Sequence, residues 1–320
     1  MNKIIHIGVL GSAAIAKRSV IPAILELPEQ FKLMAVASRA KLKAMEVASK
    51  YNCDAIQGYD DLLKREDIDA VYIPLPSGVH HEWVNKALLA GKHVYAEKSI
   101  GLNLAEITKM ISNSKENNVA LMEGFMFQYH SQHITVKKLL SEGEIGEMRS
   151  FSSSFCFPPL AKGNFRYDKN LGGGALYDAG AYPVRASFFI LGDDLEVMGA
   201  SIKNNKNGAI LFGNAFLKTT NGIGSSISFG FDNYYQCYYQ VLGSKGKITV
   251  NRAFTPDPDF SPTITVENEM GRKEITLESD NHFKKAFHEF HETCLNPKNR
   301  NKHYKEILQQ STALENISSI

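Results

Sequence analysis

An alternation of short apolar segments with helical segments along the first 124 residues constrains the fold more than any other feature. Residues 4–10, 32–38, 70–74, 93–96 and 119–124 are short and apolar, as strands buried on both faces of a parallel sheet are. Between them, residues 13–27, 42–50, 79–89 and 104–117 repeat apolar side chains at helical spacing. Strands that alternate with helices predict repeated βαβ units. We therefore predict that residues 1–124 form a doubly wound parallel sheet of the Rossmann type.

The pattern changes after residue 125. One more helix is expected over residues 128–142, and strand-like segments separated by turn residues then dominate. These segments are residues 150–157, 195–203, 209–219, 222–231, 238–243, 246–250, 263–267 and 273–277. Helices are expected over residues 174–191, 282–294 and 304–317. The predicted fold class is thus α/β. A second domain, over residues 125–320, is expected to be α+β and to contain a large, mainly antiparallel open sheet.

Composition excludes several classes of function. Lys plus Arg number 36 and Asp plus Glu number 34, so there is no basic excess of the kind that favours nucleic-acid binding. No apolar run approaches the roughly 18 residues needed to span a bilayer. The segment over residues 3–16 is also compatible with a short signal peptide, but we favour a first strand and turn.

Cysteine and histidine spacing gives no metal site. The four cysteines are scattered without paired spacing, which argues against a zinc site or a disulfide framework and fits a reducing cytoplasm. His288 and His291 are three residues apart, whereas the zinc-protease motif needs four. We therefore expect no metal and a cytoplasmic location.

A small-residue turn follows the first expected strand, where a dinucleotide fingerprint would lie. The three fingerprint glycines correspond here to Gly11, Ala13 and Ala16. The start of the next helix offers free N–H groups and a partial positive charge to phosphate. An ordinary strand–turn–helix packed with small residues is the alternative. We assign the cofactor diphosphate to this turn, which consists of Gly11, Ser12, Ala13, Ala14 and Ile15.

The end of the second expected strand indicates the cofactor. An NAD enzyme typically places Asp or Glu there to bind the ribose 2′-OH, whereas this chain has Ser38 and Arg39, with Lys43 beyond. A serine hydroxyl and a guanidinium suit a 2′-phosphate, which a carboxylate would repel. We therefore predict NADP(H) rather than NAD(H). The alternative is that these basic residues only form the solvated start of a helix.

Four segments in order along the chain resemble motifs of the Gfo/Idh/MocA oxidoreductases. They are Gly-Lys-His-Val-Tyr-Ala-Glu-Lys at 91–98, Gly-Phe-Met-Phe-Gln-Tyr-His at 124–130, Gly-Glu-Ile-Gly-Glu at 143–147 and Gly-Gly-Gly-Ala-Leu-Tyr-Asp-Ala-Gly-Ala-Tyr at 172–182. The resemblance implies a Rossmann domain and an α/β domain whose open sheet commonly forms a dimer interface. It also implies an active site between the domains, so a homodimer or higher oligomer is expected.

The resemblance assigns catalysis to Lys98 and Tyr182, with Asp178 nearby. Hydride transfer to a carbonyl leaves an alkoxide that needs a proton, which a tyrosine hydroxyl can supply when an adjacent ammonium favours its ionised form. Asp178 lies four residues before Tyr182 on an expected helix, so the two side chains should share a face. Asp178 could then hold Lys98 or a substrate hydroxyl.

Further residues are expected around the cofactor because of the same resemblance. Ser99 stands where the family usually has a proline, so the Lys98–Ser99 bond is either trans or a non-proline cis bond that the fold sustains. Arg166 precedes the glycine run, and is either a phosphate or substrate contact or a surface arginine. The remaining candidates for cofactor contact are Leu75, Pro76, Ser77, His80, Glu97 and Lys98.

These observations predict an NADP(H)-dependent oxidoreductase that transfers hydride to or from a secondary alcohol or ketone of a sugar-like substrate. Tyrosine at 182 resembles the branch that contains glucose–fructose oxidoreductase, dihydrodiol dehydrogenase and sugar 3-ketoreductases. Two alternatives remain at this point. One is a non-catalytic, nucleotide-sensing regulator of the same fold, and the other is an NAD-dependent glycoside-cleaving enzyme.

Overall fold

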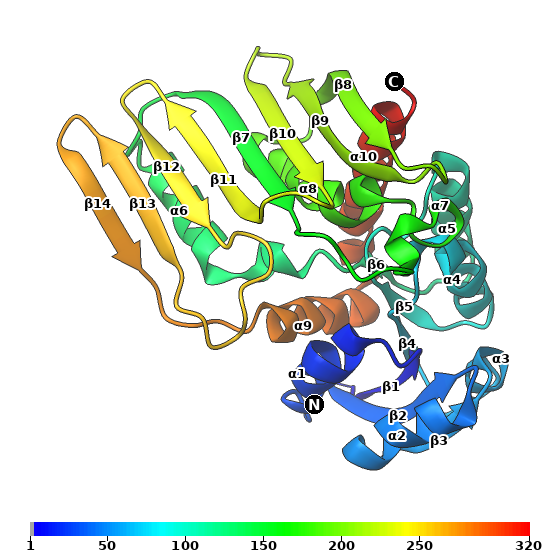
Figure 1. Ribbon diagram of the computed structural model, residues 1–320. Helices are drawn as coiled ribbons and strands as arrows, with labels where there is room; N and C mark the ends of the chain where they lie inside the picture. The colour runs from blue at the N-terminus through cyan, green and yellow to red at the C-terminus, as the bar shows by residue number, and fades with distance from the viewer. Residues whose placement is uncertain (1–2) are drawn as a thin grey trace. The chain divides into compact units, whose positions relative to one another are not determined.

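The chain forms two compact units in a computed structural model that describes residues 3–320 (Figure 1). The first unit contains the chain up to Gly124 together with Phe283–Ser311, and the second contains Phe125–His282 and Thr312–Ile320. The division after Gly124 falls where the strand pattern changes in the sequence. Phe283–Ser311, however, groups with the first unit, whereas the sequence pattern placed it in the second domain.

The first unit contains a six-stranded sheet in the order β3-β2-β1-β4-β5-β6, and every neighbouring pair is parallel. Because β1 and β4 lie side by side, the strand order reverses at this point, and ligands bind there in doubly wound sheets. The predicted Rossmann fold is confirmed. The strands are β1 (Ile5–Leu10), β2 (Phe31–Ser38), β3 (Asp54–Gln57), β4 (Ala70–Ile73), β5 (His93–Ala96) and β6 (Leu121–Glu123).

Helices connect these strands. A π-helical turn, Ala16–Val20, precedes α1 where one regular helix was expected. β3 and α3 were missed because β3 is a short edge strand whose residues are all exposed or half-buried. The helices are α1 (Ile21–Leu25), α2 (Lys41–Tyr51), α3 (Tyr59–Leu63), α4 (His80–Leu89) and α5 (Leu104–Glu116), with a 3-10 turn at Ser77–Val79.

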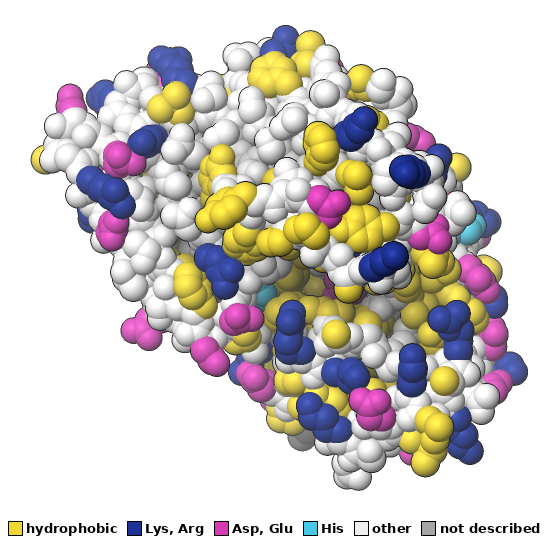
Figure 2. Space-filling view, in the orientation of Figure 1, with side chains coloured by type: hydrophobic (Ala, Val, Ile, Leu, Met, Phe, Trp, Pro, Cys, Tyr) yellow, Lys and Arg dark blue, Asp and Glu magenta, His cyan; other side chains and the backbone are white. Residues whose placement is uncertain are grey.

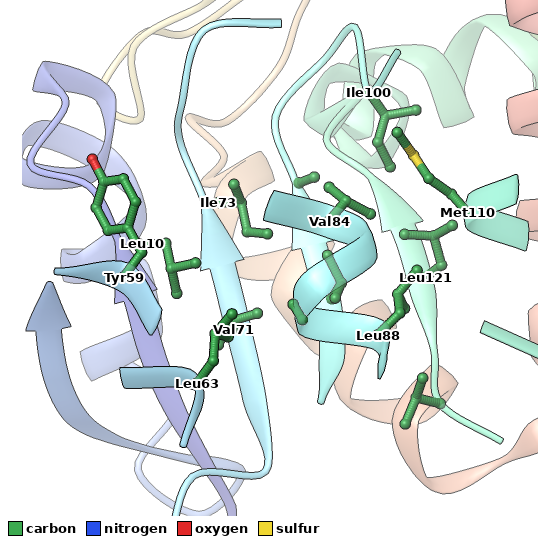
Figure 3. Packing of buried hydrophobic residues seen from close by; sticks show 14 of the residues in the cluster. Leu10, Tyr59, Leu63, Val71, Ile73, Val84, Leu88, Ile100, Met110 and Leu121 are labelled. Carbon is green, nitrogen blue, oxygen red and sulfur yellow. The ribbon is translucent and has the colours of Figure 1, made fainter. Parts of the chain in front are cut away.

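One hydrophobic core joins these helices to the sheet (Figure 3). Leu10 and Ile73 come from the central strands, and Val84 comes from α4. All three side chains are fully buried. Ile100, from the loop after β5, is buried in the same cluster, so the core also anchors that loop.

An aromatic cluster explains why α9 (His282–Leu295) belongs almost wholly to the first unit. The ring of Phe287 stacks on Tyr95 of β5, with centroids 4.6 Å apart, and Phe290 meets the same tyrosine edge-on at 5.5 Å. Both phenylalanines also contact Phe31 of β2. In α10 (Arg300–Ser318), the hydroxyl of Tyr304 lies 2.7 Å from Ser114 Oγ.

The second unit is built on an eight-stranded sheet in the order β14-β13-β12-β11-β7-β10-β9-β8. Only the β7–β10 pair is parallel, so the predicted mainly antiparallel sheet is confirmed. Its strands are β7 (Met148–Cys156), β8 (Glu196–Asn204), β9 (Ile210–Lys218), β10 (Gly224–Gly230), β11 (Gln236–Gly243), β12 (Gly246–Asn251), β13 (Thr263–Asn268) and β14 (Gly271–Thr276).

Helices α6 (Ser131–Ser141) and α8 (Ala181–Leu191) lie behind this sheet in the view of Figure 1. In α6, His133 Nδ1 lies 2.8 Å from the hydroxyl of Tyr239 in β11. Burial lowers the pKa of His133 to about 3, so the helix is joined to the sheet by a neutral imidazole. Shorter elements complete the unit: 3-10 turns at Met126–Tyr129 and Phe165–Tyr167, α7 (Lys169–Gly172) and a π-helical turn at Leu176–Gly180. A further 3-10 turn, Pro297–Asn299, precedes α10.

Two general features of residues 3–320 bear on function. None of their helices combines the length and the apolar character needed to cross a membrane. Within the same residues, no group of three or more His, Cys, Asp or Glu side chains is arranged to hold a metal ion. His288 and His291 of α9 contact different partners, since His288 Nδ1 lies 2.8 Å from Gln30 Nε2 and His291 Nε2 lies 3.0 Å from the carbonyl of Lys3.

Candidate active site

The turn after β1 has the geometry that a dinucleotide turn requires. Gly11 has φ +131°, and a Cβ atom there would lie 3.0 Å from Leu75 Cδ2, so a larger residue would be strained and crowded. Its N–H donates to the carbonyl of Ala37 at 2.9 Å. Ser12, Ala13 and Ile15 are half-buried and Ala14 is exposed, which leaves the backbone at the helix start accessible.

Ser38 is the last residue of β2, and Arg39 follows it directly. Ser38 is 5% exposed, and its Oγ accepts from the N–H of Ala40 at 3.4 Å. Arg39 is exposed, and its guanidinium lies near the hydroxyl of Tyr59. Burial raises the pKa of Tyr59 and the charge of Arg39 opposes this rise. Lys43 is exposed in the first turn of α2.

Tyr59 is a residue that the sequence argument missed. It begins α3, its ring meets Trp83 edge-on with centroids 4.8 Å apart, and it is 8% exposed. The buried phenol of Tyr59 therefore lies beside the cation at the end of β2. The sequence signal was weak, because Tyr59 lies twenty residues after Arg39 in a segment without a strong pattern.

The loop after β4 divides into an accessible part and a buried part. Leu75, Pro76 and Ser77 are half-buried, so they can contact a cofactor. His80 is 0% exposed, and its Nδ1 lies 2.9 Å from the carbonyl oxygen of Ser99. The histidine therefore contacts the loop that carries Lys98.

Residues 97–100 leave the end of β5 and carry the expected catalytic lysine. The Lys98–Ser99 peptide bond is cis, which answers the question raised by serine in place of proline. Glu97 is held by the hydroxyl of Tyr72, which donates to Oε1 at 2.8 Å. Lys98 is half-buried. Its side chain therefore remains accessible at the carboxyl end of a central strand, where α/β sheets bind ligands.

In the second unit, Tyr182 lies in the second position of α8 and is 5% exposed. Its ring packs edge-on against Phe155 and Phe125, at centroid distances of 5.0 and 5.8 Å, and lies 5.6 Å from Phe254. Its hydroxyl lies 3.8 Å from the sulfur of Met126. With Phe127, whose ring centroid lies 5.9 Å away, four aromatic rings thus surround Tyr182 and restrict the direction of its hydroxyl.

Asp178 has a partner other than those expected. Arg166 Nε donates to Asp178 Oδ2 at 2.6 Å, and the two side chains are 34% and 19% exposed. From the sequence, Asp178 was expected to hold Lys98 or a substrate hydroxyl, and Arg166 to be a phosphate contact, a substrate contact or a surface arginine. A regular helix was expected through Asp178 and Tyr182, whereas Asp178 lies in a π-helical turn. Such turns are frequent at functional sites.

The glycine run explains how this pair forms. A Cβ atom at Gly172 would lie 2.9 Å from the Cα of Arg166, so glycine lets the arginine loop approach. Gly174 has φ +87°, and a Cβ there would lie 2.5 Å from the backbone N of Ile210 in β9. The run is therefore needed for two close backbone contacts that position Arg166 and the turn bearing Asp178.

Named relatives align with nearly the whole of this chain. A dTDP-3,4-didehydro-2,6-dideoxy-alpha-D-glucose 3-reductase of Actinomadura kijaniata is 37% identical to it over 314 residues. The aligned region covers 98% of this chain and 94% of that protein. The model of the oxidoreductase family with an NAD-binding Rossmann fold matches residues 5–125, and that of the GFO/IDH/MocA C-terminal domain matches residues 133–249. The chain belongs to the GFO/IDH/MocA family. The resemblance predicted from its motifs is thereby confirmed.

Other members of the GFO/IDH/MocA family agree over most of the chain. A 3-reductase with the same substrate name from Saccharopolyspora spinosa is 40% identical, with 89% of this chain and 86% of that protein covered. An NADP-dependent D-xylose 1-dehydrogenase of Haloferax volcanii is 32% identical, with 81% and 79% covered.

A solved structure gives the same fold. KijD10, a 3-ketoreductase from Actinomadura kijaniata in complex with NADP and TDP-benzene, superimposes with a TM-score of 0.96 at 36% identity, with 99% of this chain and 98% of that chain covered. Solved forms of KijD10 include variants in which one lysine is changed to alanine or glutamate and one tyrosine to phenylalanine.

Proposed function

We propose that this GFO/IDH/MocA protein is an NADP(H)-dependent reductase that acts on the keto group of a nucleotide-linked deoxysugar. The proposal rests on one combination of features. The chain is related along nearly its whole length to dTDP-sugar 3-reductases, and it has both Lys98 and Tyr182. Ser38 and Arg39 at the end of β2 are also compatible with a 2′-phosphate. An oxidoreductase acting on a sugar-like ketone was predicted from the sequence, and its relatives have that activity.

The cofactor assignment is supported from two directions. Ser38 and Arg39 provide a hydroxyl and a cation at the end of β2, with no carboxylate in either position. KijD10 is solved with NADP, and the related xylose dehydrogenase is NADP-dependent. The accessible backbone after Gly11 fits a diphosphate. The residues present therefore fit NADP(H), as the sequence predicted.

We assign the proton transfer to Tyr182 and its support to Lys98. The spacing between these residues in the chain equals that between the tyrosine and the lysine changed in the KijD10 variants. When bound, NADPH would supply the hydride for the carbonyl carbon. Tyr182 donates its hydroxyl proton to the carbonyl oxygen, and the cationic Lys98 stabilises the tyrosinate that remains. Solvent then returns the proton to Tyr182.

Asp178 and Arg166 serve this reaction as an ion pair in our proposal. Because the pair is half-buried, its strength exceeds that of an exposed pair, and it joins the turn before Tyr182 to the loop at residues 165–167. Asp178 thus orients the start of α8. Arg166 keeps N–H groups beyond Nε with which it can meet a substrate oxygen.

A direct assay tests the proposed function. With NADPH in solution, adding a dTDP-linked 3-ketosugar is expected to cause loss of NADPH absorbance, with a kcat/KM at least tenfold above that with NADH. The reason is that a 2′-phosphate gains charge-assisted hydrogen bonds at Ser38 and Arg39. Free sugars, inositols and diols run in parallel show whether the nucleotide is required.

Other outcomes would change the assignment in defined ways. Turnover of free sugars alone would contradict a nucleotide-linked substrate. Tight NADPH binding without turnover of any compound would support the non-catalytic regulator instead. Tightly held NAD together with glycoside cleavage would support the third hypothesis that the sequence left open.

We also propose that a second copy of the chain covers the open face of the eight-stranded sheet. The middle of this face is uncharged, with charges toward the β13–β14 edge (Figure 2). Phe212 and Phe216 on β9 are 43% and 44% exposed among these polar, uncharged neighbours. The outward residues of the central strands are Ser150, Ser152, Ser154, Asn214, Ser226 and Ser228.

Replacing Phe216 with lysine is expected to convert the oligomer to monomer, because a charge on the covered face would be buried without a partner. Size-exclusion chromatography with light scattering measures the mass. A matched control is Leu42→Lys, which changes an 81% exposed leucine on α2 and should leave the mass unchanged. A wild-type monomer, or a Phe216→Lys variant of unchanged oligomeric mass, would contradict the proposal.

The cytoplasmic location stays part of this proposal. Cys53, Cys156, Cys237 and Cys294 are all free thiols in the described chain. Unpaired cysteines support a reducing compartment.

A further inference from the structure

We infer that His80 is a positioning residue for the reaction, which holds the main chain beside Lys98 and thereby aims the lysine side chain. The inference rests on the proposed function of Lys98. It differs from the expectation drawn from the family resemblance, in which His80 contacts the cofactor. Its support is a set of contacts within the first unit.

The loop that carries Lys98 is held at the residues on both sides of it. Before Lys98, the N–H of Glu97 donates to the carbonyl of Ile73 at 3.0 Å, and its carboxylate accepts from Tyr72. After Lys98, the N–H of Ile100 donates to Glu123 Oε1 at 2.9 Å. Ser99 lies between these points, 2% exposed, and its carbonyl oxygen is the atom that His80 contacts.

The chemistry of this contact defines the state of the imidazole. A carbonyl oxygen only accepts hydrogen bonds, so His80 must donate from Nδ1, at 2.9 Å. Burial lowers the pKa of His80 to about 4, and the charge of Lys98 contributes to this lowering. His80 is therefore neutral near pH 7, with its one N–H on Nδ1. A neutral ring also adds no positive charge beside Lys98.

Both ends of the contact are anchored in the hydrophobic core. His80 is the first residue of α4, and Val84, one turn later, is fully buried in the core cluster. Ile100, directly after Ser99, is buried in the same cluster (Figure 3). The His80–Ser99 bond therefore ties the lysine loop to the end of a packed helix. A shift of 1 Å in a catalytic group can lower a rate about 100-fold.

The experiment compares three variants of His80 in the full chain. His80→Leu removes the donor and is expected to lower kcat about 10- to 100-fold, with the dissociation constant for NADPH and the substrate KM changed by less than about threefold. His80→Asn places an amide N–H near the position of Nδ1 and should recover most of the lost kcat. His80→Gln places its amide farther out, near Nε2, and should recover little.

His93→Leu is the matched control for loss of a histidine that bonds the backbone in the same unit. His93 begins β5, at the end of the strand away from Lys98, and its Nδ1 accepts from the N–H of Ala120 at 2.9 Å. Its pKa is likewise lowered to about 4 by burial. This variant should lose thermal stability while its kcat stays within about threefold of wild type.

The outcomes separate the inference from its alternatives. If His80→Leu does not fold, the difference in kcat between the Asn and Gln variants decides. The inference is overturned by equal kcat in those two variants, by wild-type kcat in the leucine variant, or by loss of NADPH affinity that parallels the loss of kcat. Wild type and Lys98→Ala are assayed alongside. An inactive wild type or an active Lys98→Ala would overturn the proposed function instead.

Discussion

Replacing Tyr182 with phenylalanine is expected to lower kcat by about 100- to 10,000-fold, the usual contribution of a positioned general acid. The substitution removes one oxygen atom and leaves the ring to pack against Phe125, Phe155 and Phe254. The fold and NADPH binding should therefore be retained. Steady-state rates, NADPH fluorescence titration and thermal unfolding measure the three quantities separately.

Tyr177→Phe is the matched control for this prediction. Tyr177 lies in the π-helical turn five residues earlier, is 9% exposed, and its hydroxyl lies 3.4 Å from Ser318 Oγ. This variant loses an equivalent oxygen atom away from the expected chemistry, so its kcat should stay within about threefold of wild type. Equal rates for the Tyr182 and Tyr177 variants would show that Tyr182 supplies no proton.

Replacing Arg39 with aspartate is expected to reverse the cofactor preference. The guanidinium gives charge-assisted hydrogen bonds to a 2′-phosphate, worth about 1.5–3 kcal/mol, which corresponds to a loss of roughly 10- to 150-fold in kcat/KM for NADPH. The new carboxylate repels the phosphate further, and it can accept from the 2′-OH of NADH. Parallel titrations with NADPH and NADH give the ratio of kcat/KM values.

Lys50→Asp makes the same change of charge at the other end of α2. Lys50 is exposed, and its ammonium lies 4.9 Å from the centre of the Tyr51 ring. A general electrostatic effect of the charge change would lower NADPH use in both variants, whereas a specific phosphate contact is lost only with Arg39. An unchanged cofactor ratio in Arg39→Asp would contradict the assignment of the 2′-phosphate.

The predicted strands of both sheets correspond closely to those observed, because burial leaves a strong local pattern. Ile5–Leu10 and Phe31–Ser38 are nearly continuous apolar strands, and both were located within one residue at each end. The edge strand Asp54–Gln57 has no such pattern and was missed. Local periodicity thus revealed the buried strands and not a short exposed one.

Two features of the structure depend on packing between distant segments. Phe283–Ser311 groups with the first unit because Phe287 and Phe290 stack on Tyr95, nearly two hundred residues earlier in the chain. Asp178 pairs with Arg166 because the glycine run lets the two backbones approach. No spacing in the sequence reports such a contact.

Local patterns in the sequence were sufficient to predict the alternating fold of the first 124 residues, the family and NADP(H) as the cofactor. The fold follows from local periodicity, and the family and the cofactor follow from short motifs that can be recognised without coordinates. Three features became visible only in the packed structure: Tyr59 lies beside Arg39, four aromatic rings surround Tyr182, and the buried His80 bonds the loop beside Lys98. The physical reason is that burial and hydrogen bonding depend on which distant residues the fold brings together.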